Sequence, residues 1–510
     1  MNDVEHQSDL GTEAEIANAT ELNETADDSE LGGAVRRGLK WSFANVAVSK
    51  AISILTGIAL ARILVPEDFG VFAPALAIVN ILFGLNDLGL LLAVVRWKGD
   101  LREAARTAQT LAVIFSGVLY VGCFLAAPWF ANLVNSPDSA AVLRVLALTV
   151  FIDGLTTSAH ALLVRDFHQD RFAKAEFFAL PVNVGVSVGL ALAGAGVWSL
   201  VAGQVLANCV SGVMIFRAAP FRAGFGWSSK AARSMLVYGI PLASTSLVEY
   251  CLLNVDYLIV SRALDATAVG LYLLAFNISN WPLTIITDAV RRVSIAGFAR
   301  LEGDAGSVER NFSRGLTALL GAALPLLVAM ALLATPLIGF VYGDQWLPAA
   351  DVLEVLVVLS GARMVIGFIF DLLVGVGRTR TTLVLQTIWL IALVPALEVG
   401  VRADGLEGVA LAHAIVAIVL AVPLFGIAAY RAGANVGDAA RRLIRPLVAA
   451  VIAAAVGFAI RDHLGGRFLT LAGAGSLIIV VYLAFVLRRA AIESGLQRLR
   501  ARRTPASENG

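Results

Sequence analysis

The segment that decides the fold is 61–72, ARILVPEDFGVF, because it has a counterpart at 261–272, SRALDATAVGLY. In each copy an apolar run ends close to an Arg, and a short turn containing an acid with Pro or Ala leads into the next apolar run through a Gly. A second pair, 142–146 (VLRVL) and 352–356 (VLEVL), lies at a similar separation. Two matches at nearly one offset indicate that the chain contains two copies of one unit running in the same direction.

Long apolar blocks surround these segments. The 510 residues are 58% hydrophobic and 15% charged, whereas soluble domains contain roughly 25% charged residues. About 20 helical residues cross a hydrocarbon core of ~30 Å, and the blocks lack the alternation of barrel strands. We therefore predict an all-α integral membrane protein with about 14 transmembrane helices. The predicted spans are 41–63, 71–95, 107–130, 140–164, 175–193, 196–217, 234–260, 269–290, 312–333, 351–374, 383–401, 408–430, 443–461 and 468–487.

The repeat places the seventh span on the first and the tenth on the fourth. A repeat of six spans preserves orientation, so we expect two parallel six-helix lobes and two further C-terminal helices. Transporters built from such repeats bind substrate between the lobes and work by rocking them. The expected organisation is a disordered acidic tail at 1–34, an N-lobe at 35–230, a C-lobe at 231–432, the last two spans at 433–489 and a basic tail at 490–510.

The distribution of Lys and Arg predicts the orientation, because cytoplasmic loops carry an excess of these residues. If the N-terminus is inside, most of the 39 basic residues fall in the loops on the inner side. We therefore expect a multi-pass protein of a bacterial cytoplasmic membrane with both termini cytoplasmic. Residues 1–33 contain many acids and no Lys or Arg, which indicates a disordered tail and not a signal peptide. The loops on the outer side hold Arg62, Arg262, Arg402, Arg461 and Arg467.

Several charged residues fall within the predicted spans, where a charge costs at least about 2.5–3.5 kcal/mol and usually faces a bundle interior or a wet cavity. Lys50, Arg144 and Arg363 are the cations among them. On the seventh span Glu249 and Asp256 lie seven residues apart on one face, a spacing that suits an ion relay as well as a buried ion pair with one interfacial acid. The other intramembrane acids are Asp87, Asp153 and Asp371, for which ion pairs with Arg144 and Arg363 are the plain alternative.

Motifs of soluble enzymes are missing from the sequence. We find no G-x-x-x-x-G-K-[ST], H-E-x-x-H or G-x-S-x-G segment, which argues against an intrinsic ATPase or hydrolase. The 3 Cys and 5 His are scattered and predict neither a disulfide framework nor a metal site. We expect no enzyme activity, no cofactor and no nucleic-acid partner.

Three segments carry a resemblance to a known family. The stretch 64–70, LVPEDFG, resembles the L-x-P-x-D-F-G outer turn of Wzx-type polysaccharide transporters, which belong to the multidrug/oligosaccharidyl-lipid/polysaccharide exporter superfamily. The stretches 86–90, NDLGL, and 196–204, GVWSLVAGQ, resemble the family's second span end and its entry to the sixth span. Of the motif residues, we expect Pro66 and Gly70 to shape a turn, Trp198 and Trp346 to lie at the membrane interface, and Asp68 and Phe69 to be structural.

The resemblance implies two six-helix lobes around a central cavity that faces each side of the membrane in turn. It also implies a flippase for undecaprenyl-pyrophosphate-linked oligosaccharides in cell-surface polysaccharide biosynthesis, with a polysaccharide polymerase and glycosyltransferases as further partners beside membrane lipids. A pyrophosphate needs a hydrated cationic path. Our hypothesis is that Lys50 with Arg144 or Arg363 lines this path, and that Glu249 or Asp256 couples transport to an ion.

Two other functions were weighed. A proton- or sodium-coupled exporter of small molecules shares the expected fold. A membrane polymerase or glycosyltransferase would need a large outer loop or a cluster of catalytic acids, and neither is visible in the sequence.

Overall fold

The structure is a computed structural model that describes residues 48–86, 89–222, 224–284, 286, 305–461 and 463–503, with the backbone alone for 305–310 and 487–503. The acidic tail, Asp87 and the predicted end of the eighth span at 287–290 lie outside the described residues.

Every regular element in the described parts of the chain is a helix. A first helix covers 48–63. It is followed by α2 (Pro66–Asn86), α3 (Leu90–Val95), α4 (Leu101–Leu133), α5 (Ser139–Leu146), α6 (Leu148–Arg165), α7 (Gln169–Leu192), α8 (Val197–Ala218), α9 (Ser229–Ala263), α10 (Ala266–Ser279), α12 (Ala305–Leu332), α13 (Ala334–Val341), η2 (Asp344–Trp346), α14 (Ala349–Gly375), α15 (Thr379–Ile415), η3 (Val416–Ala421), α16 (Val422–Arg431), α17 (Val436–Arg461) and α18 (Arg467–Arg503).

Eleven helical stretches within the described residues are long and apolar enough to cross a membrane. One of them, Thr379–Arg431, contains two predicted spans, because the backbone leaves helical geometry at Asp404 and Gly405. The chain reverses there, so that Gly400 and Gly408 come into backbone contact, and a Cβ on Gly400 would lie 2.3 Å from the carbonyl oxygen of Gly408. The helix at 48–63 and α10 occupy the positions of the first and eighth predicted spans. The predicted all-α membrane fold is confirmed.

The internal repeat extends to the backbone conformation of single residues. Gly196 and Gly405, which precede the sixth and twelfth spans, have φ 54°, ψ −133° and φ 53°, ψ −128°. Residues other than Gly rarely adopt this positive φ. Asp166 and Val376, which end α6 and α14, share φ −88° and ψ 13°. Equivalent turns therefore have equal geometry in the two halves, as expected for a parallel repeat.

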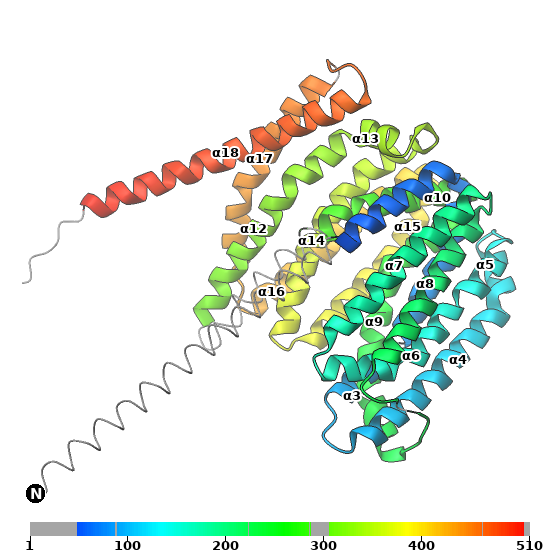
Figure 1. Ribbon diagram of the computed structural model, residues 1–510. Coiled ribbons are helices and arrows are strands. Elements are labelled where there is room, and N and C mark those ends of the chain that lie inside the picture. Colours follow the sequence, from blue (N-terminus) through cyan, green and yellow to red (C-terminus); the bar gives the residue numbers. More distant parts are fainter. Residues whose placement is uncertain are drawn as a thin grey trace, which may run out of the picture.

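The two halves meet along α2, which packs against α9 and α10. The last two helices, α17 and α18, pack on α12 and α13 at the edge of the molecule (Figure 1). The helices thus form two lobes with the C-terminal pair outside them, while the residue boundaries of the lobes stay a prediction.

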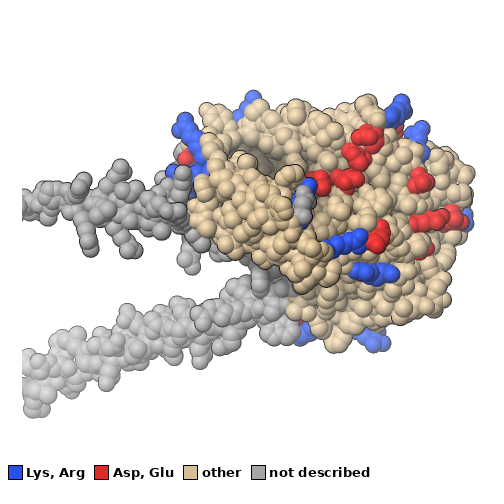
Figure 2. Space-filling model, turned by 90° about the horizontal axis from the view of Figure 1, so that it is seen from above, with Lys and Arg blue, Asp and Glu red and all other residues tan. Residues whose placement is uncertain are grey.

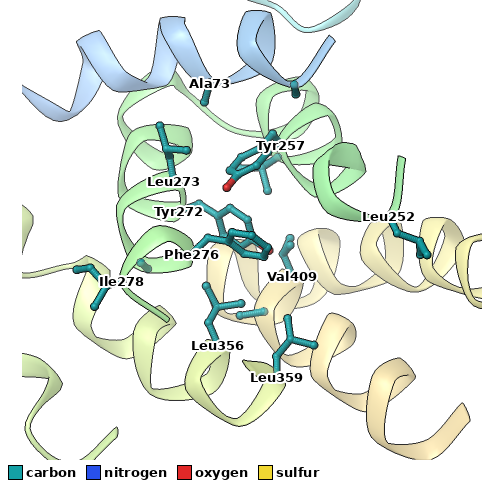
Figure 3. Packing of buried hydrophobic residues seen from close by; sticks show 14 of the residues in the cluster. Ala73, Leu252, Tyr257, Tyr272, Leu273, Phe276, Ile278, Leu356, Leu359 and Val409 are labelled. Atoms are coloured by element: carbon teal, nitrogen blue, oxygen red, sulfur yellow. The ribbon is translucent and has the colours of Figure 1, made fainter. Parts of the chain in front are cut away.

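An aromatic cluster fills the apolar core of the second lobe beside this junction. Tyr257 of α9 packs edge to face on Tyr272 of α10 with ring centroids 5.8 Å apart, and Phe276 lies 5.7 Å from Tyr257. Leu356 of α14 and Val409 of α15 close the cluster from the other side (Figure 3). These rings hold α9, α10 and α14 rigidly together within the second lobe.

The two ends of the bundle differ in charge. The end that carries α13 has acidic and basic side chains interspersed among uncharged ones, as Figure 2 shows. The opposite end carries the basic segments 96–106 and 217–233. This asymmetry agrees with the predicted orientation, in which the basic end is cytoplasmic. The orientation itself stays a prediction.

Candidate functional site

The two lobes touch most closely where α2 and α10 cross. A Cβ on Gly70 would lie 1.7 Å from the carbonyl oxygen of Ala266, and a Cβ on Gly270 would lie 1.9 Å from the carbonyl oxygen of Pro66. Only glycines at both positions allow the two helix backbones to approach this closely. The repeated Gly of the two sequence copies is therefore a symmetric contact between the lobes.

A tryptophan from the second lobe reinforces this contact. Trp346 is fully buried, and its Nε1 donates to the carbonyl oxygen of Ala61 over 2.7 Å. The Nε2 of Gln345 donates to the carbonyl oxygens of Ala61 and Leu64 at 3.0 and 3.1 Å. Phe69 lies edge-on against Trp346 at 5.2 Å. Because the last carbonyls of a helix have no partner within the helix, these donors fix the end of the first helix to the second lobe.

The two repeated arginines take part in the same closure. Arg62 donates from Nε to the carbonyl oxygen of Val341 at 2.7 Å and from Nη2 to that of Phe340, at the end of α13. A cation at a helix C-terminus is also favoured by the helix dipole. On the other side, Asn135 donates from Nδ2 to the carbonyl oxygen of Arg262 over 2.9 Å. The α13 end of the bundle is thus closed by polar contacts that run from each lobe to the other.

A cavity lies at the basic end, along the first half of α9. Its volume is about 850 Å³. The side chains of Lys230, Arg233 and Tyr238 are exposed to it, and Arg96 from the first lobe lies 5.8 Å from the centre of the Tyr238 ring. The described residues that line it are Ser229, Lys230, Arg233, Ser234, Val237 and Tyr238. The α13 end is therefore joined by polar contacts between the lobes. At the basic end α9 packs on α3 and α4, and an open cavity lies beside the cationic side chains of α9.

Lys50 lies between the lobes. Its Nζ donates to the carbonyl oxygen of Thr284 over 3.1 Å, which links the first helix to the segment after α10. Lys50 is half-buried and Thr284 is exposed. Among the three cations predicted within spans, Lys50 is the one that the structure places at the lobe junction.

Asp256 lies inside the second lobe and is fully buried. One carboxylate oxygen accepts a hydrogen bond from the Tyr272 hydroxyl at 2.9 Å and lies 3.8 Å from Nδ1 of His413. The other accepts from the backbone N–H of Tyr257 at 3.0 Å. His413 is also buried, and its Nδ1 has no hydrogen-bond partner among the described residues. Three helices thus bring a carboxylate, a phenol and an imidazole together away from water.

Arg363 of α14 lies beside this buried group in the second lobe. Its Nη1 donates to Oδ1 of Asn280 over 2.9 Å, and its guanidinium lies 5.3 Å from the centre of the Phe276 ring. Its charge is within electrostatic range of Asp256 and of Glu249, an exposed residue on α9. Of the two predicted ion-coupling acids, Asp256 is therefore buried and Glu249 is exposed. The charge of Arg363 interacts with both carboxylates.

Arg144 is set apart from the other two cations. Its Nε donates to the carbonyl oxygen of Phe124 over 3.1 Å, and the guanidinium lies 4.7 Å from the centre of the Phe124 ring. Phe124 belongs to α4 and is 41% exposed on the outside of the first lobe. Asp153, the expected pair of Arg144, accepts instead from Nδ2 of Asn86 over 2.9 Å. The structure does not bring Arg144 together with Lys50 and Arg363.

Two structural predictions for motif residues need correction. Gly70 does not shape the turn, because it lies inside α2 and its missing side chain serves the crossing with α10. Trp346 does not lie at the membrane interface, since it is fully buried and hydrogen-bonded between the lobes.

The structure also places Pro66, Asp68 and Trp198. Pro66 is the first residue of α2, where its lack of an N–H costs nothing. Asp68 accepts from the backbone N–H of Val65 at 3.3 Å, so it caps the helix start. Trp198 is 43% exposed, and its place at an interface stays a prediction.

Sequence reasoning assigned Lys230 and Arg233 to a loop and so missed them as cavity residues. Both lie on α9, which begins at Ser229. A usable signal was present, because steps of three and four residues connect Lys230, Arg233 and Val237 with Thr245 and Glu249 further along the same helix. No cluster of three or more His, Cys, Asp or Glu that could hold a metal occurs in the part of the chain that the structure describes.

Two repeated helical lobes that meet at the crossing of α2 and α10, built from helices long and apolar enough to cross a membrane, are the architecture of a membrane transporter. The sequence shows its family. A sequence model described as polysaccharide biosynthesis protein matches residues 59–351, more than half of the chain, and the chain belongs to this family. The predicted family is thereby confirmed, and the chain is a transmembrane transporter of polysaccharide biosynthesis.

Named relatives agree with this assignment. The chain is 25% identical over 489 residues to the succinoglycan biosynthesis transport protein ExoT of Rhizobium meliloti, covering 93% of this chain and 98% of that protein. It is 24% identical over 388 residues to the lipopolysaccharide biosynthesis protein WzxC of Escherichia coli, covering 75% and 78%. The teichuronic acid biosynthesis protein TuaB of Bacillus subtilis is 22% identical over 336 residues, covering 65% and 69%.

Solved structures share the fold. The lipid II flippase MurJ in an inward closed conformation matches with a TM-score of 0.69 at 15% identity, covering 88% of this chain and 99% of that one. An inward-facing MATE family transporter matches with a TM-score of 0.61 at 17% identity, covering 77% and 96%.

Proposed function

We propose that this protein moves an undecaprenyl-pyrophosphate-linked oligosaccharide across the bacterial cytoplasmic membrane by alternating access. The observation that carries the proposal is the polarity of the lobe contacts. Gly70, Gly270, Trp346 and Arg62 close one end, while a cavity of about 850 Å³ opens beside Lys230 and neighbouring cations at the other. Such an arrangement suits a substrate with an anionic head that enters from the basic side.

The substrate class follows from electrostatics. A pyrophosphate carried through hydrocarbon incurs a cost of tens of kcal/mol, so its head group needs a hydrated cationic path while the lipid tail stays in the bilayer. Arg96, Lys230 and Arg233 supply cations at the mouth, and Lys50 supplies one deeper between the lobes. Arg144 is not part of this proposed path, because it packs on Phe124 at the outside of the lobe.

We assign the coupling role to the acids of the second lobe. Asp256 is buried beside Tyr272 and His413, and the charge of Arg363 is within electrostatic range of both Asp256 and Glu249. A charge at membrane depth is costly, so a proton or a cation bound at Asp256 changes its balance with Arg363. Such a change alters the packing of α9, α10 and α15. Arg363 acts on this group in place of the direct substrate contact predicted from sequence.

The proposal also places the protein in its cellular setting. Both termini are cytoplasmic under the positive-inside rule, and glycosyltransferases that build the glycan and a polymerase that extends it are the expected partners. The proposed substrate is the lipid-linked glycan that the glycosyltransferases make.

The test is a flipping assay in vesicles that contain the purified protein. A fluorescently labelled undecaprenyl-pyrophosphate oligosaccharide is placed in one leaflet, and a membrane-impermeant quencher reports its transfer to the other. Protein-dependent transfer of this lipid, with no uptake of a cationic dye by the same vesicles, supports the proposal. Dye uptake without lipid transfer would overturn it in favour of a small-molecule exporter.

A further inference from the structure

A second cavity lies within the first lobe and has no part in the proposed passage. It occupies about 660 Å³ between α4, α6, α8 and the segment that follows α8. Its walls are mostly apolar and include Leu155 of α6 and Val213 and Phe216 of α8. These three side chains are 37%, 51% and 42% exposed. The cavity is thus an open apolar groove and not a gap in the core.

The groove faces away from the other lobe. On α6, Asp153 accepts a hydrogen bond from Asn86 of α2, the helix that contacts the second lobe. Leu155 follows two residues later, which turns it by about 200° to the opposite side of the helix. The groove therefore opens on the outside of the bundle, where the protein meets lipid.

Arginines stand at one end of the groove. Arg217, in the last turn of α8, and Arg222 both line it and are exposed. Arg222 lies 5.9 Å from the centre of the Phe216 ring, so its guanidinium lies beside the apolar wall. Among the described residues that line the groove there is no acid. The mouth is positive, and the floor is suited to hydrocarbon.

The segment that frames this mouth is fixed to α4. The Thr110 hydroxyl donates to the carbonyl oxygen of Gly226 at 2.9 Å, and the backbone N–H of Ser228 donates to the Thr107 hydroxyl at 3.1 Å. Arg102 of α4 also lies 5.5 Å from the centre of the Phe221 ring. The segment between α8 and α9 is therefore held against α4 beside the mouth of the groove.

We propose that this groove binds an anionic membrane phospholipid. One acyl chain lies along Leu155, Val213 and Phe216, and the phosphate lies between the guanidinium groups of Arg217 and Arg222. Basic pockets between transmembrane helices near the cytoplasmic side are typical sites for anionic head groups, and Arg suits a phosphate because it binds through two N–H groups at once. This site is independent of the transported substrate.

The test is native mass spectrometry of the full chain in detergent, titrated with phosphatidylglycerol or phosphatidylcholine. The wild type is expected to retain phosphatidylglycerol in preference. Each of Arg217→Gln and Arg222→Gln weakens that binding about fivefold, which corresponds to about 1 kcal/mol per basic residue. Val213→Trp, which fills the groove, displaces the lipid while both arginines remain.

Matched variants make the result specific. Arg378→Gln and Arg380→Gln remove two exposed arginines at the start of α15 in the other lobe, and they are expected to leave lipid retention unchanged. Arg217→Lys with Arg222→Lys preserves the charge and most of the binding, which separates loss of binding from loss of folding. The proposal would be overturned if Arg217→Gln and Arg222→Gln retained as much phosphatidylglycerol as Arg378→Gln and Arg380→Gln. It would also be overturned if undecaprenyl pyrophosphate displaced the bound lipid.

Discussion

At the scale of single residues, the position of Lys50 gives the most direct prediction. Its ammonium lies at the lobe junction and donates to Thr284. A charged hydrogen bond contributes about 1.5–3 kcal/mol, and about 1.4 kcal/mol changes a rate tenfold. Lys50→Gln should therefore slow lipid flipping in vesicles about tenfold or more.

Arg144→Gln is the matched control, because it removes a cation at membrane depth that packs on Phe124 away from the junction. It should change the flipping rate less than twofold. Equal losses for the two variants would show that the rate reports general destabilisation and not the passage.

Asp256 leads to a second prediction at this scale. Asp256→Asn keeps an oxygen that can accept from Tyr272 but removes the ionisable group beside His413. Flipping by this variant should no longer respond to an imposed proton or sodium gradient, while the midpoint of thermal unfolding stays within a few degrees of the wild-type value. Asp153→Asn, on the first lobe, should retain the full gradient response. A gradient response that survives in Asp256→Asn would exclude this carboxylate as the coupling site.

The candidate residues show how far sequence alone reaches at this scale. Hydropathy placed Lys50, Arg144 and Arg363 within spans, and the structure agrees that all three lie on helices or next to them. The surroundings of each cation depend on residues of other helices. Arg144 donates to the carbonyl oxygen of Phe124, and Arg363 donates to the side chain of Asn280. Both contacts join different segments of the chain, so periodicity within one helix could not predict them.

At the scale of elements, the crossing of α2 and α10 depends on two glycines. A side chain at Gly70 would overlap the carbonyl of Ala266, so Gly70→Ala must push the helices apart. Overpacking of this kind costs typically 1–3 kcal/mol. The variant should weaken closure of the lobes at the α13 end.

A cysteine placed at Ala73 reports this change, because Ala73 is buried on α2 and faces the second lobe (Figure 3). In a background without other cysteines, Gly70→Ala should raise the rate of maleimide labelling at this site severalfold. Gly57→Ala is the control, since nothing lies within 4 Å of a Cβ at Gly57. Unchanged labelling in Gly70→Ala would contradict the assigned role of the crossing.

The repeat was readable from the sequence at this scale for a physical reason. Gly70 and Gly270 each allow the same close approach of two helix backbones, so Gly is required in both copies. Trp346 has no such counterpart in the first copy. Trp346 is buried between the lobes, where its indole N–H donates to the carbonyl oxygen of Ala61 in the first lobe. The sequence around Trp346 does not contain Ala61 and could not predict this contact.

At the scale of the whole molecule, the central claim is that the lobes open one end as they close the other. In the structure the α13 end is joined by polar contacts between the lobes, and the basic end has an open cavity along the first half of α9. Loss of the contacts made by Arg62, Gln345 and Trp346 should then favour the opposite state. A variant with Trp346→Phe loses the hydrogen bond to Ala61. It should flip lipid more slowly from the basic side, because a smaller fraction of the molecules is open to that side.

Distances between spin labels measured by double electron–electron resonance test this claim most directly. One pair replaces Phe167 and Arg378, the equivalent exposed turns at the basic ends of the two lobes, and a second pair replaces Asp138 and Arg402 at the opposite end. When the lipid-linked oligosaccharide and a gradient are added, we predict that the first distance shortens while the second lengthens. If both distances stay fixed, or change in the same direction, under conditions in which lipid is being flipped, the alternating-access account is wrong.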